Sequence, residues 1–170
     1  MNINKVFKEA LKPGLLMKKD IQKAFDEIKM KYNLPEFSKF DTDFEIADLE
    51  EPDNLLRAIR KKIYAKVDMA VQLLEETLQP DTNLTTLYES RVFDEIGKNK
   101  VFEIFRQLMI MRRKLDSLEF INNEKEDAVF IVQATQDWSI LKPQIISILS
   151  KLENSWSVES DLPDKLVYLG

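Results

Sequence analysis

The sequence predicts an all-α protein, folded as a single-domain helical bundle of five or six helices. Apolar residues recur at steps of three and four along several long segments, which is the spacing of one helical face. Segments rich in Lys, Glu, Leu and Ile favour helix, and three glycines are few for a sheet-rich fold. With 170 residues, 44% of them hydrophobic, the chain is large enough to bury one sizeable core.

The N-terminal part predicts a short arm followed by a surface helix. Residues 3–11 place apolar side chains on one helical face, and Pro13-Gly14 predicts a stop, so we interpret 1–16 as a docking arm. A helix is expected from about Lys18 to Tyr32, because a narrow apolar stripe runs between charged residues there. The stripe consists of Met17, Ile21, Ala24, Phe25, Ile28 and Tyr32, and Asn33 and Pro35 predict its end.

Residues 36–54 predict an acidic connection. Aromatic and aliphatic residues alternate there with seven acidic residues. We expect the apolar side chains to hold the segment on the bundle while the carboxylates face water. Two alternatives are a contact segment for a basic partner and a metal site that uses Glu45 and Asp48. The apolar residues are Phe37, Phe40, Phe44, Ile46 and Leu49, and the acids are Asp41, Asp43, Glu45, Asp48, Glu50, Glu51 and Asp53.

One of two central helices is predicted at about 55–78, with Asp53 as the N-cap and Pro80 just beyond its end. Basic residues crowd the first half of its polar face, although a helix dipole prefers acids there. We interpret this basic face either as simply solvated or as a contact for a partner. The apolar seam is Leu56, Ile59, Ile63, Val67, Ala70, Leu74 and Leu78, and the bases are Arg57, Arg60, Lys61, Lys62 and Lys66.

The second central helix is predicted at about 101–118, after a short helix within 80–97 and a break at Gly97. A second apolar row lies beside its seam, so we expect it to contact several neighbours. Arg112, Arg113 and Lys114 follow near its C-terminal end, where the dipole favours cations. The seam is Val101, Ile104, Leu108, Met111, Leu115 and Leu118, and the second row is Phe102, Phe105 and Met109.

A last helix is predicted to begin at Asn123, which forms a capping box with Glu126. The run 128–132 is compatible with a strand, but the helical stripe that continues beyond it favours helix. Pro143 should kink the helix or restart it near Ser139. Residues 156–170 form a C-terminal tail, with Trp156 either covering the bundle or anchoring a partner.

The residue inventory excludes several kinds of chemistry. The chain has no cysteine and no histidine, so thiolate sites, Ser-His and Cys-His nucleophiles and Glu-x-x-His di-iron sites are excluded. Three scattered glycines do not form a phosphate-binding loop. The remaining enzymatic alternative is a magnesium-dependent all-α hydrolase that uses the carboxylate pairs Glu45/Asp48 or Glu124/Asp127. We expect no enzymatic activity, no cofactor and no metal.

The sequence therefore favours a non-catalytic protein–protein interaction module, an adaptor or an accessory subunit of a larger assembly. The alternative is a nucleic-acid-associated factor with basic patches on two helices, although a net charge of −5 argues weakly against it. Another protein or a second copy of the chain is the expected partner, and no membrane is expected. We expect a cytoplasmic protein, or a nuclear one in a eukaryote. The candidate partner-binding residues are Arg57, Arg60, Lys61, Arg112, Arg113, Lys114 and Trp156.

Overall fold

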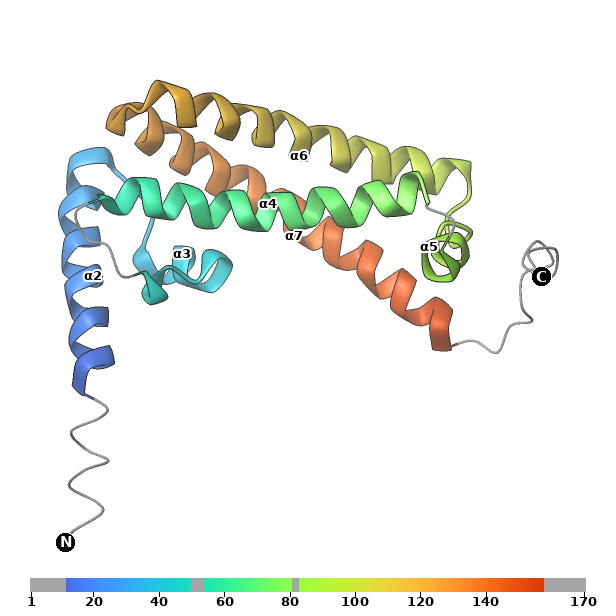
Figure 1. Cartoon of the computed structure of the whole chain (residues 1–170), viewed down its shortest axis with the longest axis horizontal. Helices are drawn as coiled ribbons and strands as arrows, with labels where there is room; N and C mark the ends of the chain where they lie inside the picture. Colours follow the sequence, from blue (N-terminus) through green and yellow to red (C-terminus); the bar gives the residue numbers. More distant parts are fainter. Residues whose placement is uncertain (1–11, 50–53, 81–82, 158–170) are drawn as a thin grey trace, which may run out of the picture. The chain divides into compact units, whose positions relative to one another are not determined.

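The computed structural model describes residues 12–49, 54–80 and 83–157, with side chains described from Ile21 onward. Within these ranges it contains six α-helices, one 3-10 turn and no strand, which confirms the all-α prediction (Figure 1). The α-helices are α2 (Lys12–Tyr32), α3 (Phe37–Phe44), α4 (Leu55–Leu78), α5 (Leu84–Glu89), α6 (Glu95–Ile121) and α7 (Glu124–Ser157), and the 3-10 turn is η1 (Ile46–Asp48).

The two predicted central helices are present: α4 has the predicted bounds, and α6 contains 101–118. The chain divides into two compact units. Among the described residues, unit 1 comprises those up to Lys66 and Leu115–Thr135, and unit 2 comprises Val67–Lys114 and those from Gln136 onward. The prediction of a single domain stays a prediction.

In unit 1 the acidic segment is more regular than the expected connection, because it contains α3 and η1. Its apolar side chains pack as predicted: Phe40 and Phe44 are fully buried, and the Phe40 ring lies 5.6 Å from that of Phe25 on α2. Glu45 has a left-handed backbone with a φ of 55°, which ends α3. The N–H of Ala47 then donates to Asp41 Oδ1 at 2.7 Å, so an acidic side chain stabilises the turn that follows.

The apolar seams lie in the interior as predicted. All six residues of the α6 seam are buried, and on α4 all but Leu78 are buried. The run 128–132 is helical, and Trp138 is buried on the α7 seam. Asn123 caps α7 by accepting bonds from the N–H groups of Lys125 and Glu126. These outcomes follow from burial of the apolar face of each helix.

Three predicted helix boundaries are wrong. Pro13-Gly14 lies in the first turn of α2 instead of ending a helix, a place that tolerates proline because the N–H groups there have no helical acceptor. Gly97 lies inside α6, and its N–H donates to the side chain of Asp94, the residue just before the helix. The predicted break between helices therefore lies before Glu95 and not at Gly97. The helix α7 continues through Pro143 without the restart near Ser139, whereas the alternative, a kink at Pro143, stays a prediction.

Other predictions fall on residues outside the described ranges, namely the helical face of 3–11, the Asp53 cap and the tail beyond Ser157. Among the described helices, none combines the length and the apolar character needed to cross a membrane.

Candidate functional site

Arg60, a candidate from the predicted basic face of α4, lies inside unit 1. Its side chain is only 3% exposed. Its guanidinium donates a hydrogen bond to Glu119 on α6, and Nη1 lies 3.4 Å from Asp127 Oδ1 on α7. Arg60 therefore joins three helices of unit 1 by ion pairs, and its charge is not presented to solvent.

Arg57 and Lys61 lie closer to the surface of the same helix. Arg57 is partly exposed, and its Nη2 lies 2.7 Å from Glu119 Oε1, so a single carboxylate binds two arginines. Lys61 is exposed. Of the three candidate cations on α4, two are thus engaged by Glu119, which reduces the positive charge of the predicted basic face.

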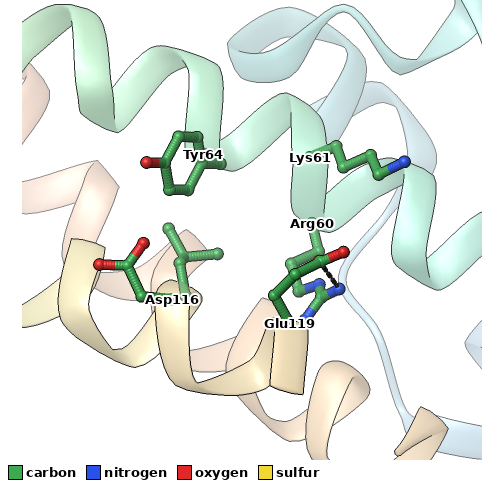
Figure 2. A pocket seen from close by; sticks show the side chains of 6 residues that line it. Arg60, Lys61, Tyr64, Asp116 and Glu119 are labelled. Atoms are coloured by element: carbon green, nitrogen blue, oxygen red, sulfur yellow. Dashed lines mark hydrogen bonds and ion pairs between the residues drawn. The ribbon is translucent and has the colours of Figure 1, made fainter. Parts of the chain in front are cut away.

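A cleft of about 310 Å³ lies beside this network, between α4 and the part of α6 that belongs to unit 1. Figure 2 shows Arg60 and Glu119 at one end, Tyr64 and Asp116 at the other, and Lys61 directed away from them. Two basic and two acidic residues line the cleft, so their formal charges cancel. The arrangement is that of an ion-pair network next to an aromatic ring, and it gives no surplus of charge for a phosphate or a metal ion.

The pKa values of the two carboxylates of the network, Glu119 and Asp127, are shifted in opposite directions. The hydrogen bond from Arg57 lowers the pKa of Glu119, and the charge of Arg60 lowers it further. Burial raises the pKa of Asp127, and the charges of Arg60 and Arg57 oppose that rise. Glu119 is therefore held as a carboxylate, whereas the ionised form of Asp127 depends on the arginines beside it.

A second hollow, of about 430 Å³, opens where α4 begins. Its cations are Arg57, Lys61 and Lys62, and its other lining residues include Asp48 and Asn54. This is where the predicted basic face of α4 reaches the surface. Lys66, the last base of that face, binds Glu45 at 2.8 Å, and this hydrogen bond lowers the pKa of Glu45.

The second basic cluster, on α6, belongs to unit 2. Arg112 is partly buried, and its Nη2 lies 3.0 Å from Asp68 Oδ1 on α4. Arg113 and Lys114 are exposed. The structure thus places the two predicted clusters in different units, and their merger into one basic surface stays a prediction.

The second apolar row on α6 remains partly at the surface. Phe102 is 53% exposed, its ring stacks on Phe105 at 6.3 Å, and Phe105 and Met109 are half-buried. The expectation that neighbours surround this helix holds for the seam, and in the second row it fails at Phe102.

Trp156, the remaining candidate, lies near the end of α7 in unit 2. Its Nε1 donates to Glu89 at 2.8 Å, and its ring lies 4.5 Å from that of Tyr88 on α5. The Tyr88 hydroxyl in turn donates to the Ser155 carbonyl. The indole holds α5 against α7 and is still half exposed.

The carboxylate pairs proposed for magnesium face cations instead. Glu45 binds Lys66, Glu124 binds Lys31, and Asp127 lies beside Arg60. Within the described ranges there is no cluster of three or more acidic residues suited to a metal ion. Three of the four proposed side chains, Glu45, Glu124 and Asp127, are thus engaged in ion pairs.

Sequence reasoning missed a charge-free surface on α7 in unit 2. Between Gln136 and Ser150 every exposed side chain is uncharged, in a chain of which 32% is charged, and the two charged residues of this stretch, Asp137 and Lys142, are only partly exposed. We call this surface the α7 charge-free face. The sequence contains a signal for this surface, because only two of the residues from 136 to 150 are charged. The face consists of Gln136, Ser139, Ile140, Pro143, Gln144, Ile146, Ser147, Leu149 and Ser150.

Comparisons with protein-family models, with curated proteins and with solved structures find no match to this chain.

Proposed function

We propose that this chain is a non-catalytic protein–protein interaction module, an adaptor or an accessory subunit of a larger assembly. We further propose that the α7 charge-free face contacts the partner. The observation that carries the proposal is the exposure of Ile140, Ile146 and Leu149, at 62%, 51% and 41%, along four turns of α7 in which both charged residues, Asp137 and Lys142, are only partly exposed. The centres of protein interfaces are depleted in charged residues, and these turns of α7 share that property.

The polar groups on this face support the same use. The Ser139 hydroxyl donates to the Gln136 carbonyl at 2.6 Å, and the Gln144 amide donates to the Ile140 carbonyl at 3.0 Å. Each of these side chains makes one hydrogen bond within its own helix, which lowers the number of polar groups that a covering partner must satisfy. Pro143 contributes apolar surface without adding an N–H donor.

The nucleic-acid alternative has less support. Arg57, Arg60 and Arg112 take part in ion pairs within their units, which leaves fewer cations to neutralise phosphates. Binding by the remaining bases predicts a steep loss of affinity with added salt, and a flat salt response rejects this alternative.

The magnesium-dependent hydrolase predicts turnover that Glu45→Gln or Glu124→Gln abolishes, and no turnover across a nucleotide panel rejects it.

The test is an affinity pull-down from native extract with and without nuclease, read by mass spectrometry. We compare the unmodified chain with Ile140→Glu/Ile146→Glu, which places two carboxylates on the charge-free face. The matched control is Met69→Glu on α4, because Met69 is exposed to a similar extent, 65%, at the middle of a helix.

We expect stoichiometric partners that resist nuclease, bind the Met69→Glu control and are lost from the double variant. Partners that vanish with nuclease contradict the proposal and favour nucleic acid. Partners that bind the double variant as well as the original show that this face is not the contact. Circular dichroism provides the folding control, because exposed substitutions of this kind change stability by only about 0.5 kcal/mol.

A further inference from the structure

A groove with an apolar floor and a polar rim lies between α6 and α7 in unit 2. The hollow measures about 310 Å³. Its buried lining residues are apolar, and the side chains of its exposed lining residues are polar. The floor contains Phe93, Val101, Ile104 and Ile148. We call this the α6–α7 groove.

The rim of the groove carries uncompensated positive charge. Lys100 on α6 and Lys151 on α7 are exposed, and in the described part of the chain neither takes part in an ion pair. The Lys151 ammonium lies 5.7 Å from the centre of the Phe93 ring. The acid of the rim, Glu103, is bound by Arg106 through two hydrogen bonds, which also lower its pKa. The groove therefore favours an anionic group next to an apolar one.

Apolar surface continues along both helices past the hollow. On α6, Ile96 and Ile110 are exposed and share the helical face of Lys100, and on α7, Ile140 shares the face of Gln144 and Lys151. From Ile96 to Ile110 the helix rises about 21 Å, at about 1.5 Å per residue. A small anion covers only a fraction of that length, whereas four turns of a helix match it.

We infer that the α6–α7 groove binds an amphipathic helix of a partner protein, with its apolar face on the groove floor and its carboxylates near Lys100 and Lys151. This is the helix-in-groove mode of recognition, combined with complementary charge. The inference rests on the proposed function, because it names the class of partner for the surface adjoining the α7 charge-free face. A second copy of the chain is disfavoured as the occupant, because a symmetric contact brings the same two lysines together.

The test uses two synthetic peptides of about 18 residues, or five helical turns. Both carry the same leucine face, and their polar faces carry either glutamate or lysine. Binding to the full chain is followed by fluorescence anisotropy of a label on the peptide. Lys100→Glu/Lys151→Glu reverses the rim charge, and Lys23→Glu/Lys125→Glu makes the same change in net charge at exposed lysines outside the groove.

We expect the glutamate peptide to bind and the lysine peptide to bind much more weakly. The rim variant should weaken binding of the glutamate peptide about tenfold, since it replaces two attractive pairs by repulsive ones, while the control pair stays within about twofold. Equal binding of both peptides, no binding of either, or equal losses in the two variants overturns the inference. Complete competition by inorganic phosphate also overturns it, because the site then recognises the anion alone.

The two proposals fail separately. If Ile140→Glu/Ile146→Glu abolishes capture of the native partner while the rim variant retains it and binds the peptide normally, the interaction function stands and the groove inference is wrong. If neither variant affects native capture and neither peptide binds, the chain still binds a partner, but the groove inference and the assignment of the contact to the α7 charge-free face are both wrong. If the glutamate peptide binds through the lysines but no partner resists nuclease, the groove inference stands and the proposed function is wrong.

Discussion

Replacing Arg60 by methionine is expected to destabilise the protein strongly, through the carboxylate that it leaves behind. The Arg60 and Asp127 side chains are 3% and 7% exposed, and their charged atoms lie 3.4 Å apart. Removing one partner of a buried ion pair costs about 3–5 kcal/mol, because the remaining charge is buried without its partner, and Arg57 offsets only part of that cost at Asp127. At roughly 2–4 °C per kcal/mol for a chain of this size, the melting temperature should fall by about 6–20 °C.

The loss in the Arg60→Met variant should depend on pH. Burial raises the pKa of Asp127, and Arg60 is the strongest influence that lowers it, so the variant should raise that pKa further. The folded variant then holds a proton more tightly than the unfolded chain does, and its stability falls as pH rises between the two pKa values. The stability gap to the original chain should be largest at neutral pH and should narrow toward about pH 4, the ordinary pKa of aspartate.

Thermal unfolding followed by circular dichroism across this pH range measures the gap. Arg60→Met/Asp127→Leu should recover most of the loss, since apolar replacement of a whole buried pair is often neutral. Arg112→Met is the matched control: its pair with Asp68 is 28% and 24% exposed, so it should cost about 1 kcal/mol or less. A gap that is constant with pH, or a double variant no more stable than Arg60→Met, refutes the reasoning.

Three further predictions concern local features of the helices. Asn123→Ala should lower the free energy of unfolding by about 1 kcal/mol in denaturant titration, whereas Asn123→Asp keeps the cap of α7 and should be neutral. Gly97→Ala should fail to give the usual gain of about 0.5–1 kcal/mol, because the new Cβ meets the Cβ of buried Phe93 at 3.2 Å, and a full gain contradicts this contact. The variants Trp138→Phe and Trp156→Phe each leave one tryptophan, whose fluorescence can be measured alone. Trp156 should emit at longer wavelength than Trp138 and be quenched more readily by acrylamide, because it is more exposed. Equal quenching of the two contradicts this difference in exposure.

The apolar periodicity was sufficient to predict the fold class and the core, because a helix buries the face on which its apolar residues recur. The same periodicity contained a signal about Arg60 that charge counting overlooked. Arg60 follows Leu56 by four residues and precedes Ile63 by three, so it lies at the edge of the buried seam. Its acceptors, Glu119 and Asp127, are 59 and 67 residues away. Local spacing indicates that an arginine is buried, but only the tertiary fold brings the acids to it.

The helix boundaries show a similar limit. Pro13, Gly97 and Pro143 are helix breakers by intrinsic preference, yet all three lie within helices. Each lies in a different setting. Pro13 lies in the first turn of α2, the Gly97 N–H is bonded to Asp94, and Pro143 is exposed to solvent next to the Ile140 carbonyl, which accepts a hydrogen bond from the Gln144 side chain. Intrinsic preference is a weak guide wherever the surrounding structure can satisfy the backbone groups.

The distribution of charge bears on where a partner binds. Several basic residues that the sequence predicts to be exposed are neutralised by ion pairs within their units, so counting basic residues in the sequence overestimates the positive charge of the surface.

The α7 charge-free face is a surface that counting basic residues does not reveal. In unit 2, α7 buries Trp138, Leu141, Ile145, Ile148 and Leu152 on its seam. That seam already supplies the apolar contacts that hold the helix in place. Ile140, Ile146 and Leu149 add little to those contacts and leave apolar surface in water, which is unfavourable for an isolated chain. A partner that covers these three side chains removes from water the apolar surface that unit 2 leaves exposed, and this burial favours binding.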